Sequence, residues 1–383
     1  MGCSAGGLVP DAQLASRGPR SSHSNPLDLN CLGSPVLAGE SCRARISGRR
    51  AKVRAVVVGL GAVGGAVARE LSSVGLEALE LVDQVPGRAQ ALARRLGPPA
   101  QAATWSERLL SSGDVVVLAV PGPQGQLARL ALGRGAHVVS VADAPVVMAD
   151  LLSMDAEARE RDRHVAVGAA FCPGLSCVLA RHGSVAFDVV DEIHVAKAGT
   201  GGPACASQHH RSMSGYGVEW RDGEWSRPPA GSGRSLCLFP EPVGYRDCYR
   251  GRLGDPLLLV PAFTGVRRVS ARIAATRRDR VTASLPMLWS PHPEGLLGAV
   301  RVELRGWRGS ARETCLLGVI DRPAGATGLV AALAAQWCLR SKLSRPGAAG
   351  LAQLVEDPVS FLRALGSRGL RAAVFEGSEA TTP

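Results

Sequence analysis

The chain has 383 residues, of which 46 % are hydrophobic and 4 % aromatic, and its formal net charge is +11. This length accommodates two domains, and no apolar run approaches the roughly 18 residues that a membrane-spanning helix needs. The positive charge does not indicate nucleic-acid binding, because aromatic residues are few, no nucleic-acid-binding motif is present, and eight basic residues against three acidic ones lie within residues 1–54. We therefore expect a cytoplasmic, enzyme-sized protein that binds neither nucleic acid nor membrane.

Residues 1–50 are rich in Ser, Gly, Pro and Arg and show no sustained apolar period, which predicts a disordered leader or translation from an upstream start-codon artefact. The ten cysteines of the chain are scattered, without a C-x-x-C pair or zinc-type spacing. This spacing indicates neither a disulfide framework nor a metal site, so we predict buried thiols and no metal.

From residue 51 to 183, apolar strand-like runs alternate with helix-like segments. Strands are predicted at 53–58, 78–83, 114–120, 137–141 and 165–170, and helices at 62–74, 87–96, 123–133 and 147–161. Alternating strands and helices imply right-handed crossovers and a parallel sheet covered on both faces. The prediction is an α/β, doubly wound Rossmann domain over 51–183, with its ligand at the carboxyl ends of the strands.

The first predicted strand breaks into the glycine turn Gly59-Leu60-Gly61-Ala62-Val63-Gly64 and then into a helix. In such a turn the first glycine permits the bend, the second lets backbone amides approach a pyrophosphate, and the third lets the helix lie close to the strand. A bare G-x-G-x-x-G is weak evidence, but the strand before it and the helix after it make it a dinucleotide-binding signal.

Asp83 lies 24 residues after Gly59, at the end of the second predicted strand. A carboxylate there can accept both hydroxyls of an adenosine ribose and repel a 2′-phosphate, which favours NAD. Arg88 can instead accommodate that phosphate, so NADP stays possible. The predicted cofactor-binding residues are Gly59, Gly61, Ala62, Val63, Gly64, Asp83, Arg88, Val120, Pro121 and Asp143.

After residue 183 the apolar period changes to that of strands with one wet face, for example at 193–197 and 300–305. We predict an inserted substrate and dimerisation domain with a mixed or antiparallel α+β sheet over 184–322. Residues 198–256 are rich in Gly and Pro and are predicted to form a long functional loop. Helices at 326–341 and 357–368, within a segment 323–383, are predicted to return to the Rossmann domain.

Candidate chemical residues lie near the predicted cleft. His209 and His210 follow the glycine cluster of the long loop, and imidazole has a pKa suited to proton transfer. Lys197 ends a strand, where burial of its ammonium would lower its pKa. The alternative for the two histidines is that they are simply exposed on the loop. The alternative for Lys197 is a strand-end lysine that reaches water. The predicted catalytic residues are His209, His210 and Lys197.

The segment Cys172-Pro173-Gly174 ends a strand and begins a helix, where a thiol can have a lowered pKa. A thiol that packs beneath the cofactor is an equal alternative. Arg211 and Arg246 are candidate clamps for a substrate carboxylate, among many arginines. The predicted substrate-binding residues are Cys172, Pro173, Gly174, Arg211 and Arg246.

The glycine turn, the strand end 117–121, the segment 168–174 and the segment 220–225 together resemble the saccharopine dehydrogenase-like family, which includes saccharopine reductases, carboxynorspermidine dehydrogenases and lysine dehydrogenase-like proteins. The resemblance covers about 52–377. It implies NAD(P)-dependent hydride transfer to or from an amino acid or imine-type substrate, and a homodimer. Where the family has Asp-Pro-Gly, this chain has Cys172-Pro173-Gly174, which leaves the substrate open.

Two alternatives belong to other classes of protein. One is an NAD(P)-binding sensor or regulatory protein without turnover. The other is a Rossmann-like methyltransferase, which the strand-end Asp83 and the inserted sheet disfavour.

Overall fold

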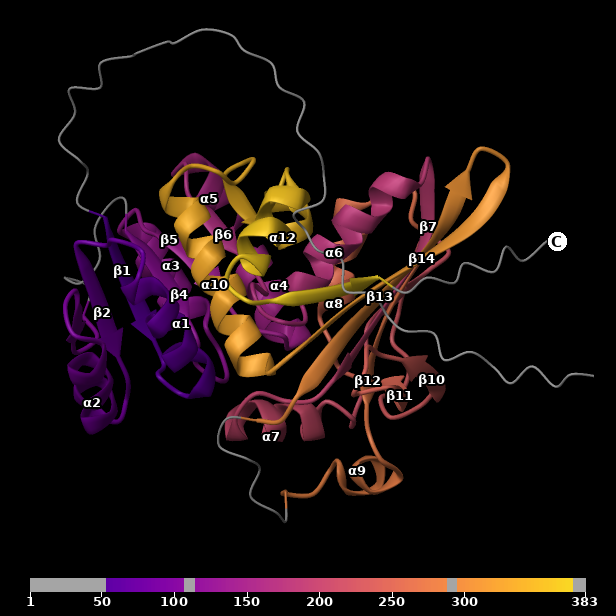
Figure 1. Ribbon diagram of the computed structural model, residues 1–383, viewed down its shortest axis with the longest axis horizontal. Helices are drawn as coiled ribbons and strands as arrows, with labels where there is room; N and C mark the ends of the chain where they lie inside the picture. The colour runs from indigo at the N-terminus through magenta and orange to yellow at the C-terminus, as the bar shows by residue number, and fades with distance from the viewer. Residues whose placement is uncertain (1–52, 107–113, 288–294, 375–383) are drawn as a thin grey trace, which may run out of the picture.

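In the computed structural model, residues 53–106, 114–287 and 295–374 are described, and the predicted leader lies outside them. A parallel sheet and a mixed sheet stand side by side, joined by helices (Figure 1). None of the helices in these ranges has the length and apolar character to cross a membrane.

The first sheet is parallel throughout and has the order β15-β6-β5-β4-β1-β2-β3. Its strands are β1 (Arg54–Val58), β2 (Ala78–Val82), β3 (Ala100–Ala102), β4 (Val115–Leu118), β5 (His137–Ser140), β6 (His164–Ala166) and β15 (Gly347–Ala349). The strands β1 and β4 are apolar and buried on both faces, as expected for a sheet covered by helices on both sides. The predicted doubly wound Rossmann sheet is confirmed.

Helices connect these strands. They are α1 (Ala62–Ser72), α2 (Pro86–Leu96), α3 (Gly125–Gly133), α4 (Pro145–Leu152), α5 (Asp155–Glu160) and α6 (Leu175–Gly183). The single helix predicted at 147–161 is wrong, because the chain turns at residues 153–154 and forms α4 and α5 instead.

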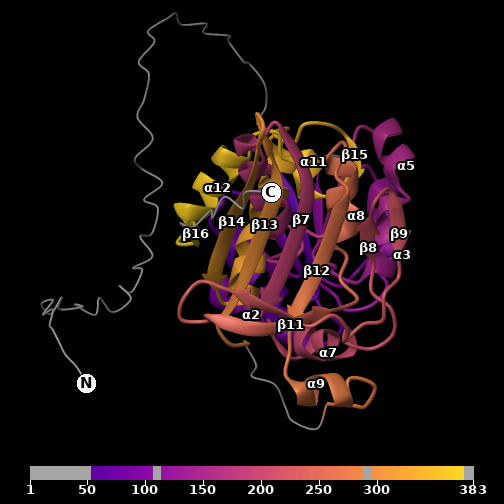
Figure 2. The same ribbon diagram turned by 90° about the vertical axis from the view of Figure 1, so that its right-hand side faces the viewer.

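The second sheet is mixed, since β12 pairs in parallel with β7 while β13 pairs with β7 in antiparallel register. Its strands are β7 (Val189–Ala198), β8 (Glu219–Arg221), β9 (Glu224–Ser226), β10 (Ser235–Leu238), β11 (Tyr245–Arg250), β12 (Arg268–Ala274), β13 (Gly298–Arg308), β14 (Ala311–Asp321) and β16 (Arg371–Val374). Figure 2 shows β14, β13, β7 and β12 side by side.

The prediction of a long loop over 198–256 is wrong, because this segment forms a helix and several strands. It contains α7 (Pro203–Arg211), which begins at a proline, and the four strands from β8 to β11. Two further helices follow in the chain, α8 (Asp255–Leu259) and α9 (Arg277–Thr282). The strands β8 to β11 were not predicted, because they are too short to show the period-2 pattern from which strands are recognised.

The last part of the chain contributes to both sheets. It contains α10 (Pro323–Leu339), α11 (Leu351–Leu354) and α12 (Pro358–Gly366), together with β15 in the first sheet and β16 beside β14 in the second. The prediction for 323–383 named helices only and therefore missed the strands β15 and β16. Helix α10 is buried along almost its whole length, and one hydrophobic core extends from the first sheet across α10 and α6 to β7 and β13.

Helices α10 and α1 approach closely at Gly328. A Cβ on Gly328 would lie 2.5 Å from the Cβ of Ala66, whereas one on Gly325 of the same helix would meet nothing within 4 Å. Gly328→Ala is therefore expected to lower the free energy of unfolding by about 1–3 kcal/mol through overpacking. The matched variant Gly325→Ala should be neutral or stabilising by up to about 1 kcal/mol, because alanine favours helix. Urea denaturation of both variants measures the difference, and equal effects would contradict it.

Candidate active site

The glycine turn between β1 and α1 is shaped by close backbone packing. Gly59 has φ +88°, and a Cβ on it would lie 2.7 Å from the carbonyl oxygen of Ala119. A Cβ on Gly64 would lie 1.7 Å from the carbonyl oxygen of Gly59. Helix α1 also begins without a side-chain cap and without an acidic residue in its first turn. Its first amides are thus available to an anion, as a pyrophosphate requires.

Asp83 is anchored at the end of β2. Its Oδ2 accepts from the Leu60 amide at 2.7 Å and its Oδ1 from the Val85 amide at 2.8 Å, while Arg88 Nη1 lies 3.2 Å from both oxygens. Burial raises the pKa of Asp83, but these hydrogen bonds and the Arg88 charge outweigh it, so the net pKa is lowered. The carboxylate is ionised and fixed beside the glycine turn.

A cleft of about 1940 Å³ opens between the carboxyl ends of the first sheet and the second sheet. Nine of the ten predicted cofactor-binding residues line it, and Gly64 beneath the turn does not. Lys197, His209, Cys172 and Arg211 line it as well. His210, Pro173, Gly174 and Arg246 are not among its lining residues.

Lys197 on β7 reaches across the cleft to the first sheet. Its Nζ lies 2.9 Å from Asp143 Oδ2, just beyond β5, and Gln208 Nε2 on α7 donates to the other oxygen of Asp143. Burial lowers the pKa of Lys197, but the Asp143 charge more than compensates, and the net pKa is raised. The predicted loss of pKa is therefore wrong, because sequence alone did not reveal the carboxylate partner.

Cys172 lies on the wall of the cleft, beside a buried carboxyl group. Its Sγ donates to Asp255 Oδ1 at 3.3 Å, and Ser176 Oγ donates to the same oxygen at 2.7 Å. Burial and the Asp255 charge raise the pKa of Cys172 well above its ordinary value. The predicted lowering of this pKa is wrong, since burial and the nearby carboxyl group oppose thiolate formation more than the helix start favours it.

Sequence reasoning missed Asp255, which is fully buried at the start of α8. Burial raises the pKa of its carboxyl group. Among the described residues no donor reaches its Oδ2. The only sequence signal was an acid placed before a proline at a helix start, and many helices show that pattern.

The two adjacent histidines of α7 point to different surroundings. His209 lines the cleft, with Nε2 3.1 Å from the Ala274 carbonyl oxygen, and in the described part of the chain its buried Nδ1 has no hydrogen-bond partner. Burial and the Lys197 charge lower the pKa of His209 to about 4. His210 is buried away from the cleft residues, with Nε2 2.7 Å from the Thr282 carbonyl oxygen.

Of the two arginines predicted to bind a substrate carboxylate, one lines the cleft and the other does not. Arg211 lines the cleft, whereas Arg246 lies on β11 and contacts the Tyr245 carbonyl oxygen at 3.1 Å. Arg227 and Arg252, which the sequence did not single out, also line the cleft. Nothing in the local sequence distinguishes them from the other arginines of this arginine-rich chain.

Comparisons with known proteins agree with this architecture. Residues 54–144 match the family described as NADP oxidoreductase, coenzyme F420-dependent. The fold is similar to apo saccharopine dehydrogenase (L-Glu forming) from Saccharomyces cerevisiae, with TM-score 0.63 and 13 % identity over 85 % of this chain and 100 % of that chain. No curated protein matches the sequence.

Two further solved structures also resemble this chain. GenD2 from gentamicin A biosynthesis in complex with NAD has TM-score 0.43 and 15 % identity, over 85 % of this chain and 97 % of that chain. A probable dehydrogenase from Thermotoga maritima has TM-score 0.43 and 10 % identity, over 84 % and 98 %. The similarity to saccharopine dehydrogenase confirms the resemblance at the level of the fold, a Rossmann-type parallel-sheet domain with a mixed-sheet domain beside it.

Gly61 provides a test of nucleotide binding that leaves the fold intact. A Cβ on this residue would meet nothing within 4 Å, so Gly61→Ala is expected to fold normally. A nucleotide diphosphate seated on the turn would meet that methyl group, and NADH affinity should fall at least tenfold. Fluorescence titration with NADH measures this, with Gly133→Ala on α3, also free of contacts, as the control. Unchanged affinity in Gly61→Ala would place the nucleotide elsewhere.

Proposed function

We propose that this protein is an NAD(P)-dependent oxidoreductase that transfers hydride to or from an amino acid or imine-type substrate. The observation that carries the proposal is the polar cluster of Lys197, Asp143 and His209, which lies in the same cleft as the glycine turn. Bound on that turn, a nicotinamide coenzyme supplies the hydride acceptor or donor. The cluster lies between the two sheets, where a substrate next to the nicotinamide belongs.

Lys197 acts as a fixed hydrogen-bond donor. Because the pKa of its ammonium is raised, it keeps its charge at neutral pH, and one of its protons is engaged by Asp143. The remaining protons are available to a substrate carboxylate or carbonyl oxygen. A donor already held in place loses little entropy when the substrate binds, which favours orientation of the reacting carbon.

His209 acts as the proton acceptor in the direction of amine oxidation. Its ring is neutral, and with Nε2–H donating to the Ala274 carbonyl, the buried Nδ1 carries a lone pair that no donor among the described residues engages. The C–H bond of the substrate breaks with its electron pair, which leaves as hydride, and the N–H proton passes to Nδ1. Reduction of an imine reverses both transfers.

Arg211, Arg227 and Arg252 supply positive charge to the lining of the cleft. Such charge suits a substrate with a carboxylate, and guanidinium groups can bind it bidentately. Asp83 favours NAD at the adenosine end, and Arg88 beside it keeps NADP open as the alternative.

The direct test is NADH consumption with a panel of amines and 2-oxo acids, and NAD reduction with a panel of amino acids. Turnover with any member supports the proposal. NADH binding without turnover across the panel supports instead a nucleotide-binding sensor.

Lys197→Met is expected to lower kcat by roughly 100-fold or more, because a preorganised donor is lost from the reacting centre. Lys342→Met is the matched control, since Lys342 lies over Trp337, away from the cleft. Steady-state kinetics with the best substrate of the panel measures the effect. A loss of similar size in both variants would remove Lys197 from the proposed role.

The pH dependence of kcat follows from His209. Its pKa is lowered to about 4 from 6.5, so the neutral ring that accepts the proton persists as pH falls and is lost only near pH 4. The acid limb of kcat due to this group should therefore lie near pH 4, and His209→Gln should abolish it. A limb near pH 6.5 that persists in His209→Gln would exclude His209 as the acceptor.

A further inference from the structure

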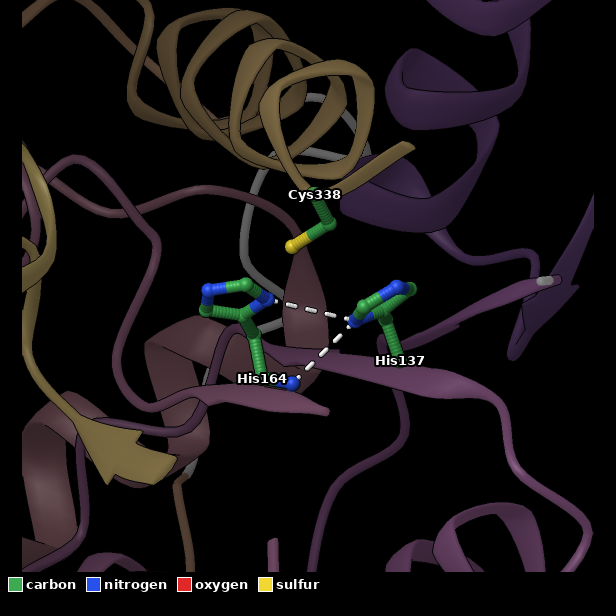
Figure 3. A group of neighbouring side chains, drawn as sticks. All are labelled: His137, His164 and Cys338. Atoms are coloured by element: carbon green, nitrogen blue, oxygen red, sulfur yellow. Dashed lines mark hydrogen bonds between the residues drawn. The ribbon is translucent and has the colours of Figure 1, made fainter. Parts of the chain in front are cut away.

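Three potential metal ligands meet at the amino-terminal edge of the first sheet, opposite the cleft. His137 begins β5, His164 begins β6, and Cys338 lies near the end of α10. One ligand-capable atom from each side chain lies within 4.8 Å of those of the other two. Figure 3 shows the Cys338 thiol pointing from α10 toward the space between the two imidazole rings.

All three side chains are shielded from solvent. The exposed fractions are 9 % for His137, 7 % for His164 and 2 % for Cys338, and the thiol is free of any disulfide. A buried polar group without a partner costs about 1–3 kcal/mol, so natural structures rarely leave one unsatisfied. The Nε2 of His164 has no hydrogen-bond partner among the described residues, but the ring nitrogen that faces His137 is its Nδ1.

The spacing of the two rings suits a tetrahedral cation. Their Nδ1 atoms are 3.3 Å apart, and the lone pair of His137 Nδ1 accepts the His164 backbone amide at 3.1 Å, so a cation bound at this nitrogen would replace that hydrogen bond. Two nitrogen ligands at the usual zinc–nitrogen distance of about 2.0–2.1 Å, with a tetrahedral angle between them, lie about 3.3 Å apart. The spacing of the two Nδ1 atoms is therefore that of two nitrogen ligands of one zinc ion, once His164 Nδ1 has lost its proton.

We propose that His137, His164 and Cys338 form a binding site for a zinc-class divalent cation. Two imidazoles and one thiolate favour zinc over the oxygen-seeking cations magnesium and calcium. Three protein ligands leave the fourth tetrahedral position to water or another small donor. The negative charge of Asp162 favours a positive charge at both rings, whereas the positive charge of Arg163 disfavours it.

The role of this site is structural and independent of the proposed hydride transfer. Helix α10 follows directly after β14 of the second sheet and packs against α1, β4 and β5 of the first. A cation held by Cys338 and the two histidines ties the end of this helix to two neighbouring strands. Metal binding thereby stabilises the folded state over the unfolded chain.

The test uses the full chain, stripped with a chelator and titrated with Co²⁺ and Zn²⁺. The wild-type protein should bind about one equivalent of Co²⁺ with a thiolate-to-metal charge-transfer band and the intense visible bands of a tetrahedral centre. Added Zn²⁺ should abolish those bands and raise the unfolding temperature. Absence of the charge-transfer band in the wild-type protein would overturn the proposal without any variant.

Variants assign the ligands. Cys338→Ser and His164→Gln should weaken Zn²⁺ binding by more than the roughly 10–100-fold that loss of an outer-shell partner costs. Cys315→Ser, a half-buried cysteine on β14, is the matched control and should bind metal like the wild type. A charge-transfer band that persists unchanged in Cys338→Ser would assign the metal to another cysteine and overturn the site. Far-UV circular dichroism verifies that each variant folds, and NADH binding is expected to be unaffected.

Discussion

The ion pair between Lys197 and Asp143 is the interaction on which the arrangement of the cleft depends. It joins β7 of the second sheet to the end of β5 in the first, and only 11 % of the Lys197 side chain is exposed. Breaking such a pair leaves a buried charge uncompensated, which is far more costly than losing a surface ion pair. The two sheets are therefore held at a separation that keeps both charges matched, with Gln208 of α7 as a third member.

Burial and nearby charges together set the ionisation of the groups around this pair. Burial and the Lys197 ammonium lower the pKa of His209, while burial and the Asp255 charge raise the pKa of Cys172. The cleft thus holds a charged donor, a neutral imidazole and an un-ionised thiol at neutral pH. That division of roles suits chemistry in which the protein orients the substrate and moves one proton, and the coenzyme carries the electrons.

The sequence predicted the Rossmann half of the molecule well because its signals are local. The apolar run of β1, the turn at Gly59 and the acid at Asp83 can each be recognised from a short stretch of sequence, although Gly59 packs against Ala119 and Asp83 accepts from the Leu60 amide. The second half was harder to predict. Its short strands pair with partners far along the chain, and α7 begins in a Gly- and Pro-rich segment where helix propensity is weak.

Site residues followed the same division. The glycine turn and Asp83 were found from spacing, whereas Asp255 and Arg252 gain their positions only when α8 and the loop after β11 pack against the cleft. His209 and His210 were indistinguishable as neighbours in sequence, and the helical rotation between them sends one to the cleft and the other to Thr282.

The sequence by itself determined the doubly wound sheet, the glycine turn and the change to a second type of sheet, because hydrophobic period and glycine spacing act over short distances along the chain. Only the tertiary structure decided which charges face one another across the cleft, and therefore whether Lys197 and Cys172 have raised or lowered pKa values. It also decided that His137, His164 and Cys338 meet, since they come from two strands and a helix far apart in the chain. Burial and electrostatic interaction depend on distance in space, and residue spacing along these segments does not encode that distance.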